Sequence, residues 1–228
     1  MDFIKDEAIV LRKSPAGDYD LSITVYLRKY GKENIYIPKG QLLKSPFLHA
    51  TEPFTWFKGI FTKRREKFFI KEIDKSRALG ILISKEKDRF ETAYFITELF
   101  NRYVIFPDEK VFILLKKSIY YLTQEIDTEV FKLNFLAKLI FLSGIFPEVD
   151  VCVRCGKMIT EKTYKMFSIP EGGTVCKNCS KSKSYIQYCD IKNLRELKIV
   201  NFKNLNKLKI KNVGKLHHLL LEYLSKNY

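Results

Sequence analysis

Two closely spaced pairs of cysteines are the residues of this sequence with the clearest chemistry. Cys152 and Cys155 form one Cys-x-x-Cys pair, and Cys176 and Cys179 form a second pair twenty residues later. Each pair presents two sulfurs to one ion, and the interval lets the chain fold back, so the spacing fits tetrahedral zinc. Four thiolates leave no open position for water or substrate, which predicts one structural Zn²⁺ per chain. An iron–sulfur cluster and redox dithiols are the alternatives, and Cys189 is expected to be a buried or incidental thiol.

Residue combinations typical of enzymes are missing from the sequence. The three histidines, His49, His217 and His218, do not neighbour a serine or cysteine in a nucleophile pattern. The sequence contains no Walker-type phosphate loop and no Gly-x-Gly-x-x-Gly motif. Its carboxylates are scattered, without the cluster that a metal-dependent nuclease needs. The sequence therefore predicts a protein without catalytic activity.

The charge of the chain is strongly basic and uneven. The 228 residues carry a formal net charge of +15. Residues 151–228 contain 16 Lys and Arg against 5 Asp and Glu, whereas residues 76–150 contain 10 against 11. Clustered cations release counterions from a phosphate backbone, so a polyanionic partner is expected. Alternatively, the lysine-rich composition only reflects the source of the protein. This explains the excess of positive charge, but it explains the uneven distribution of that charge less well.

The first 75 residues have the pattern of a small β domain, in which apolar and polar residues alternate. The expected strands are residues 8–11, 21–28, 33–39, 54–61 and 66–73. Five short strands with one long connection, between the third and the fourth, fit a small barrel of the OB type. A three-plus-two sandwich fits the same pattern nearly as well.

A barrel of the OB type binds single strands of nucleic acid with a basic groove and with aromatic side chains that stack on bases. The candidate phosphate contacts are Arg28, Lys29, Lys39, Lys44, Lys63, Arg64 and Arg65. The candidate stacking residues are Tyr26, Tyr36, Trp56 and Phe68. Each of these aromatic residues is, taken alone, more typical of a barrel core than of a binding surface.

Helical periodicity begins near Arg77 and continues to the cysteine pairs. Asp88 with Glu91 resembles a capping box, and Asp108 and Asp127 are expected at the starts of two further helices. Residues 148–189 form the cysteine module. Two more helices are expected over residues 190–200 and 213–228, in the basic C-terminal segment.

The predicted fold class is therefore α+β. An OB-type β-barrel at residues 1–76 is followed by an α-helical domain at 77–228, which contains the four-cysteine zinc module. The first seven residues are too acidic for a secretion signal. The longest uncharged run, residues 139–147, is far shorter than the roughly 20 residues that cross a bilayer. A cytoplasmic protein without a membrane partner is expected.

The order of these parts resembles the bacterial DNA repair protein RecO family over nearly the whole chain. The resemblance is carried at the N-terminus by short motifs, which are Glu7-Ala-Ile-Val-Leu11, Gly17-Asp-Tyr-Asp20, Tyr30-Gly31-Lys32 and Lys39-Gly40. Its most specific part is the cysteine segment from Cys152 to Cys179, with Gly156 and the pair Gly172-Gly173. The family often has arginines directly after the Lys-Gly pair, where this chain has Gln41, Leu42 and Leu43.

The resemblance implies a non-enzymatic recombination mediator with an OB domain, a helical domain and a zinc module. Members of that family bind single- and double-stranded DNA and anneal complementary strands. They work with RecR to load RecA onto single strands covered by single-stranded-DNA-binding protein. Some members contact the acidic tail of that binding protein through the helical domain. A nucleoid-associated, cytoplasmic location follows from these partners. The alternative hypothesis is an RNA-binding or ribosome-associated protein that combines a zinc ribbon with an OB barrel.

Overall fold

The computed structural model describes residues 3–182 and 184–227 of the chain. The chain forms two compact units, Met1–Ile126 and Asp127–Tyr228. The first unit contains a five-stranded sheet and the helices that follow it, and the second contains the cysteines and the C-terminal helices. A mixed α+β fold with an N-terminal sheet is thereby confirmed. The domain boundary expected near residue 76 stays a prediction.

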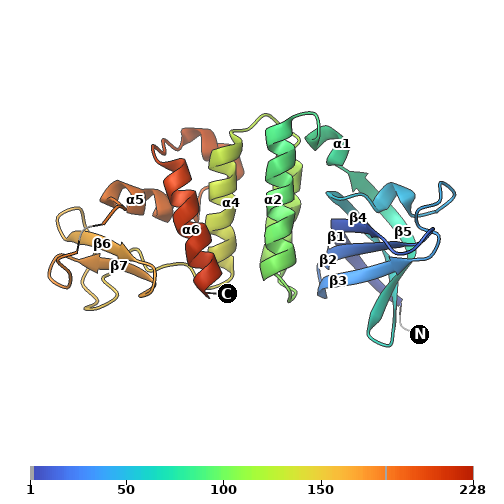
Figure 1. Cartoon of the computed structure of the whole chain (residues 1–228), viewed down its shortest axis with the longest axis horizontal. Coiled ribbons are helices and arrows are strands. Elements are labelled where there is room, and N and C mark those ends of the chain that lie inside the picture. Colours follow the sequence, from blue (N-terminus) through green and yellow to red (C-terminus); the bar gives the residue numbers. More distant parts are fainter. Residues whose placement is uncertain (1–2, 183, 228) are drawn as a thin grey trace. The chain divides into compact units, whose positions relative to one another are not determined.

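The sheet of the first unit is antiparallel throughout, with the strand order β3-β2-β1-β4-β5 (Figure 1). Its strands are β1 (Phe3–Pro15), β2 (Leu21–Leu27), β3 (Gly31–Ile37), β4 (Thr55–Arg64) and β5 (Lys67–Ala78). The alternation in the sequence explains its core, because Leu21, Ile23, Val25 and Leu27 are all buried on one face of β2. Ile35 and Ile37 of β3 join the same apolar cluster.

The two edge strands of this sheet, β3 and β5, approach each other. The ring of Tyr30, just before β3, lies 5.0 Å from the ring of Phe68 in β5, measured between centroids. The hydrogen-bonded ladders of the described residues do not include a β3–β5 pair. The pairing therefore gives an open five-stranded sheet, and its closure into a barrel stays a prediction.

The 3-10 helix η1 (Leu48–Ala50) lies between β3 and β4, and three α-helices follow β5 in the described part of the first unit. They are α1 (Gly80–Ile83), α2 (Lys87–Tyr103) and α3 (Glu109–Tyr121). The capping box expected at Asp88 and Glu91 is wrong: α2 begins at Lys87, and its N-cap, Glu86, makes no side-chain cap. The amide of Phe90 bonds to the carbonyl of Glu86, which extends the helix upstream and leaves Asp88 in its first turn. The start expected at Asp108 is confirmed, since its carboxylate accepts the amide of Val111 at 2.9 Å.

The connection from α2 to α3 is fastened to the turn between β2 and β3. The hydroxyl of Tyr26 donates to the carbonyl of Phe106 (2.8 Å) and accepts the amide of Asp108 (3.1 Å). The amide of Lys32 donates to the carbonyl of Ile105 at 2.9 Å. Gly31 has φ of +78°, and a Cβ there would lie 2.3 Å from the same carbonyl oxygen. Only glycine fits this close approach of two backbones.

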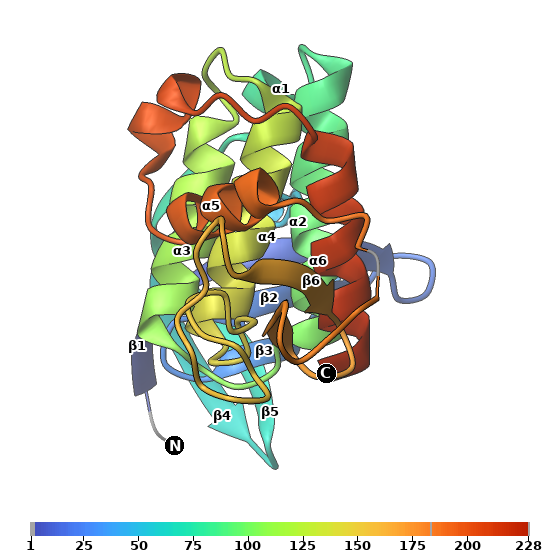
Figure 2. The same ribbon diagram turned by 90° about the vertical axis from the view of Figure 1, so that its left-hand side faces the viewer.

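The second unit combines long helices with a small hairpin (Figure 2). Its elements are α4 (Thr128–Leu142), β6 (Tyr164–Ser168), β7 (Gly173–Cys176), α5 (Tyr188–Leu197), the 3-10 helix η2 (Phe202–Lys207) and α6 (Val213–Asn227). Asp127 caps α4 as expected, because its carboxylate accepts the amides of Glu129 and Val130. Helix α4 is apolar on most sides, and α5, η2 and α6 all pack against it. The last residue expected in the final helix, Tyr228, lies outside the described residues.

Among the described residues, no helix is both long enough and apolar enough to cross a membrane.

Candidate metal centre and basic surfaces

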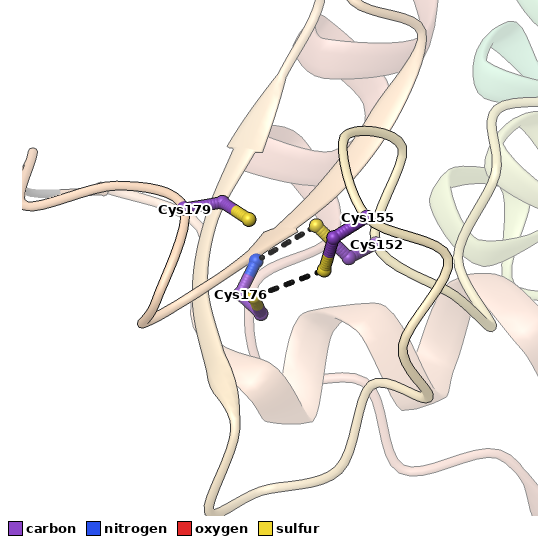
Figure 3. A group of neighbouring side chains, drawn as sticks. All are labelled: Cys152, Cys155, Cys176 and Cys179. Atoms are coloured by element: carbon purple, nitrogen blue, oxygen red, sulfur yellow. Dashed lines mark hydrogen bonds between the residues drawn. The ribbon is translucent and has the colours of Figure 1, made fainter.

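The sulfur atoms of the two cysteine pairs converge on one point of the second unit (Figure 3). The four Sγ atoms of Cys152, Cys155, Cys176 and Cys179 lie within 4.8 Å of one another. The Sγ atoms of Cys155 and Cys176 are 3.7 Å apart, far beyond the roughly 2.05 Å of a disulfide bond. Zn–S bonds of about 2.3 Å in a tetrahedron place neighbouring sulfurs about 3.8 Å apart. The cluster therefore has the dimensions of a site for one tetrahedral ion.

Each Cys-x-x-Cys pair is bent by its own backbone. The amide of Gly156 bonds to the carbonyl of Cys152 at 2.8 Å, and Gly156 has φ of +71°. The amides of Cys179 and Ser180 bond to the carbonyl of Cys176 at 3.1 and 3.2 Å. These closed turns hold both sulfurs of a pair on the same side, which is the property that the spacing predicts.

The hairpin β6–β7 joins the two pairs. Cys176 is the last residue of β7, and the strand packs along the segment before the first pair. The amide of Val153 donates to the carbonyl of Thr174 (3.0 Å), and the amide of Thr174 donates to the carbonyl of Glu148 (2.9 Å). The interval between the pairs thus contains a two-stranded ribbon that returns the chain to the first pair.

Arg154, between the first two cysteines, ties the turns together. Its guanidinium donates two hydrogen bonds of 2.7 Å to the carboxylate of Glu171, which lies between β6 and β7. It also donates to the carbonyl of Cys179 at 2.5 Å, and Ser168 donates to the same carboxylate. The sequence pattern does not single out Arg154, Glu171 or Ser168. A basic residue inside a Cys-x-x-Cys turn is the one available signal, and it does not reveal the partner.

The environment of the thiols favours negative charge at the buried end of the cluster. Burial opposes ionisation of Cys152, but the backbone amides of Cys176, Arg154 and Cys155 outweigh it and lower the pKa of Cys152 to about 6. Hydrogen bonds to the sulfurs of Cys155 and Cys176 raise the pKa of Cys179 to about 12. Cys179 therefore keeps its proton at neutral pH, and a bound cation would replace it.

The fifth cysteine lies outside this cluster of four. Cys189 is exposed near the start of α5, with its Sγ 3.8 Å from the side-chain oxygen of Gln187. The expectation of a buried thiol is therefore wrong, and that of an incidental thiol stays a prediction.

The candidate phosphate contacts fall into three places of the first unit. Arg28 and Lys29 lie in the turn between β2 and β3, and Lys63, Arg64 and Arg65 lie at the tip of the β4–β5 hairpin. Lys39 and Lys44 lie in the long connection from β3 to β4. The strand register places the first two groups at one end of the sheet and the third group at the other end.

Arg28 is engaged by carboxylates of its own unit. Its guanidinium is ion-paired with Glu7 of β1, at 3.0 Å, and with Glu109 of α3. Hydrogen bonds and charge attraction from Glu109 and Glu7 raise the pKa of Arg28. Glu7 also accepts from Lys116 at 2.6 Å and from the indole of Trp56 at 2.8 Å. This arrangement ties α3 to the sheet, so Arg28 has a structural task that the sequence did not reveal.

The hairpin tip is more accessible. Lys63 is ion-paired with Glu66 at 2.6 Å, while Arg64 and Arg65 are both exposed. Arg65 and Glu66 both have positive φ, of 46° and 62°, as in the tight two-residue turn of a hairpin. The tip therefore presents arginine side chains to solvent on a defined backbone.

The candidate stacking residues also divide into buried and accessible side chains. Tyr26 and Phe68 are buried, so their prediction as base-stacking residues is wrong and the core interpretation holds. The Nζ of Lys116 lies 4.0 Å from the centroid of the half-buried Trp56 ring and covers it. Tyr36 is 43% exposed and is the one of the four with an accessible ring.

A cleft of about 470 Å³ lies between β1, β4, β5 and α3, within the first unit. Trp56, Ile113 and Tyr120 contribute apolar surface to it, and its basic lining residues are Lys75, Arg77, Lys116 and Lys117. The cleft was not expected, because its lining comes from four elements that lie apart in the sequence.

Two family models together match most of the chain. The model described as "Recombination protein O N terminal" matches residues 1–78. The model described as "Recombination protein O C terminal" matches residues 93–228, which include all four clustered cysteines.

Several similar proteins are named as DNA repair proteins. The chain is 28% identical to the "DNA repair protein RecO" of Thermoanaerobacter sp. (strain X514), over 100% of this chain and 97% of that protein. It is 30% identical to the "DNA repair protein RecO" of Halalkalibacterium halodurans, over 78% of this chain and 69% of that protein. It is 28% identical to the "DNA repair protein RecO" of Caldanaerobacter subterraneus subsp. tengcongensis, over 86% of this chain and 79% of that protein.

Proposed function

Since this chain belongs to the recombination protein O family of DNA repair proteins, we propose that it is a non-enzymatic, DNA-binding recombination mediator. It binds single- and double-stranded DNA and promotes annealing of complementary strands. With RecR it assists the loading of RecA onto single strands covered by single-stranded-DNA-binding protein. The observation that carries the proposal is the match of both family models, over residues 1–78 and 93–228.

The proposed annealing mechanism is electrostatic. Two single strands repel each other through their phosphates, and basic surfaces that bind both strands lower this repulsion. The net charge of +15 supports such a role, as do the exposed arginines of the hairpin tip. Base pairing then supplies the favourable free energy. Of the predicted contacts, Lys29, Lys39, Lys44, Lys63, Arg64 and Arg65 are the proposed phosphate ligands, and Arg28 is assigned mainly to the fold.

We infer that the sheet of the first unit is an OB-type barrel. The strand order β3-β2-β1-β4-β5 supports this inference, because it leaves β3 and β5 as the strands that closure would join. The approach of these two strands and the contact of Tyr30 with Phe68 support it further. A barrel of this kind positions basic turns around a surface for single strands.

The proposed ion of the four-cysteine cluster is a single structural Zn²⁺. Cys152, Cys155, Cys176 and Cys179 would hold it, and their tetrahedral spacing supports zinc. A closed shell of thiolates gives the ion no position for a reacting water, so its contribution is to the stability of the second unit.

The cleft beside Trp56 suits the acidic tail of the single-stranded-DNA-binding protein. Ile113 and Tyr120 offer apolar surface to a hydrophobic side chain, and Lys75, Arg77 and Lys117 surround it with positive charge. Because Lys116 covers the indole ring, the cleft is better suited to carboxylates than to a stacked base. A DNA-directed protein with these partners would work in the cytoplasm, associated with the nucleoid.

Strand annealing tests the proposal. Complementary oligonucleotides, bare or coated with single-stranded-DNA-binding protein, are mixed with and without the protein and with and without RecR. Faster pairing in the presence of the protein is expected, together with an affinity that falls steeply with salt. Unchanged annealing rates would contradict the mediator function. A strong preference for RNA in a competition with DNA of the same sequence would favour the RNA-binding alternative.

A further inference from the structure

The segment of residues 38–46, here called the leucine loop, presents apolar side chains to solvent at one end of the sheet. Leu43 is 91% exposed, more than any other large hydrophobic residue of the described part of the chain. Leu42 is 38% exposed. Lys39 and Lys44 lie on either side of the two leucines, and both are exposed. A single exposed leucine needs no explanation, but two adjacent exposed leucines between two exposed lysines have the composition of a contact surface.

Hydrogen bonds hold the leucine loop in one shape. The amide of Leu42 bonds to the carbonyl of Lys39 at 3.2 Å, and the amide of Ser45 bonds to the carbonyl of Leu42 at 2.9 Å. The second bond closes a β-turn in which Leu43 and Lys44 occupy the two corners. Corner side chains point away from the turn, so the shape of the backbone keeps Leu43 from folding back onto the core.

The loop is also fastened to the neighbouring turn between β1 and β2. The amide of Lys39 donates to the carboxylate of Asp20 at 2.7 Å, and the amide of Gln41 donates to the carbonyl of Tyr19 at 2.9 Å. The side chain of Gln41 donates to the carbonyls of Gly17 and Asp20, at 2.9 and 2.6 Å. The exposed leucine is therefore preorganised, which lowers the entropy cost of inserting it into a partner.

Two exposed aromatic residues accompany the loop. Tyr19 is 61% exposed, and Tyr36 is 43% exposed and donates its hydroxyl to Asp20. The carboxylate of Asp20 accepts the amide of Lys39 and offsets part of the charge of that lysine. The loop thus combines two exposed cations with apolar surface. Its distinctive groups are apolar and aromatic, which are the groups that insert between bases or stack on them.

We propose that the leucine loop is a base-contacting wedge. Leu43 inserts against or between the bases of a bound strand, Lys44 contacts the adjoining phosphate, and Tyr36 offers a ring to a neighbouring base. This proposal rests on the proposed DNA-binding function, and it adds a second kind of contact to it. Charge at the hairpin tip holds the backbone, while the leucine loop separates stacked bases so that they become available for pairing.

Fluorescence of 2-aminopurine, placed in a single-stranded or a duplex oligonucleotide, tests the wedge because this base brightens when its neighbours unstack. Wild-type protein is expected to raise the fluorescence. Leu43→Ser should lose more than half of that response and bind about tenfold more weakly, whereas Leu43→Met should retain both. Lys44→Gln should keep the fluorescence response but reduce the salt dependence of binding by about one phosphate contact. Ile81→Ser, at a residue of α1 that is 76% exposed, is the matched control and should behave as wild type.

Three outcomes would overturn the wedge. If Leu43→Ser binds DNA and brightens 2-aminopurine as wild type does, the proposal is wrong while the DNA-binding function stands. If wild-type protein binds neither oligonucleotide, the wedge proposal and the proposed DNA-binding function are both wrong. A third arm uses vesicles of phosphatidylcholine and phosphatidylglycerol in equal parts. Leu43-dependent binding to these vesicles without an effect on DNA would assign the loop to a lipid surface instead.

Discussion

Arg154 and Glu171 form a bidentate ion pair across the cysteine cluster, with both N–O distances at 2.7 Å. Arg154 lies inside the first Cys-x-x-Cys turn. Glu171 lies in the connection between β6 and β7, and β7 leads into the second Cys-x-x-Cys turn. The same guanidinium donates to the carbonyl of Cys179. The pair therefore couples the two halves of the proposed zinc site independently of the sulfurs, in the planar geometry that suits arginine and not lysine.

Removal of this pair is expected to weaken metal binding without removing a ligand. In Arg154→Ala the two turns are held only by backbone contacts, so zinc should dissociate about tenfold faster. Release is measured with a colorimetric chelator. Arg154→Lys should not restore the wild-type rate, because an ammonium cannot make the bidentate contact. Lys162→Ala, at an exposed residue of the same module, is the control and should release zinc at the wild-type rate. If Arg154→Ala released zinc as slowly as the wild-type protein, the sulfurs alone would position the turns.

Loss of a sulfur should have a larger effect. Cys155→Ser is expected to release the metal and to lower the melting temperature of the second unit, since metal affinity contributes directly to folding free energy. Zinc content is measured by elemental analysis, and unfolding by circular dichroism. Cys189→Ser removes a thiol outside the cluster and should change neither quantity. Wild-type protein treated with a strong chelator should unfold at the same temperature as Cys155→Ser. Full stability without zinc would contradict a structural site.

The four-cysteine cluster and the strand pattern could be predicted because both depend on local spacing. Two sulfurs separated by two residues must share one turn, and residues Leu21, Ile23 and Val25 must share one face of a strand. A core position was the more typical interpretation of Phe68, but its burial could not be predicted from the sequence alone, because phenylalanine also stacks on bases at binding surfaces. Nor could the partners of Arg28, since its carboxylate Glu109 lies 81 residues away in the sequence.

The distinction between structural and DNA-directed arginines can be measured. Arg28→Gln removes the ion pairs with Glu7 and Glu109, so it is expected to lower the melting temperature. Arg65→Gln, at the exposed hairpin tip, should leave the melting temperature unchanged. It should weaken DNA binding at low salt and reduce the salt slope by about one. Fluorescence anisotropy with a labelled oligonucleotide measures the binding. The opposite pattern, with Arg28 needed for DNA and Arg65 for stability, would contradict the assignment.

A buried carboxylate in the second unit predicts a dependence of stability on pH. Asp190 is 1% exposed and accepts from Lys215 at 2.6 Å. Burial alone would raise the pKa of Asp190, but hydrogen bonds from Lys215, the amide of Gln187 and Asn212 outweigh it and lower the pKa. A carboxyl with a lowered folded pKa stabilises the protein above its unfolded pKa of about 4, and this stabilisation is lost as the pH falls through the folded value.

Asp190→Asn tests this contribution. At pH 7 the substitution leaves Lys215 without its carboxylate and should cost about 3 kcal/mol in the free energy of unfolding. Below pH 4 the difference between the two proteins should shrink, because the wild-type carboxyl is then protonated too. Urea unfolding of both proteins at each pH measures the difference in their free energies of unfolding. Any loss of metal at low pH affects both proteins alike and cancels in this difference. A difference that stays constant from pH 7 to pH 3 would show that the ionic form of Asp190 contributes nothing.

The contact of Gly31 with the α2–α3 connection predicts an effect that backbone strain alone cannot produce. Gly31 and Gly17 both have positive φ, of +78° and +100°, so alanine is strained at either position. A Cβ at Gly31 would lie 2.3 Å from the carbonyl oxygen of Ile105, whereas a Cβ at Gly17 has no described atom within 4 Å. Gly17→Ala should therefore cost only about 1 kcal/mol, measured by urea unfolding. Gly31→Ala should cost at least about 2 kcal/mol more, because the backbone at Ile105 must move and the hydrogen bond from Lys32 is lost. Equal losses for the two variants would mean that the connection yields freely and does not hold α3 against the sheet.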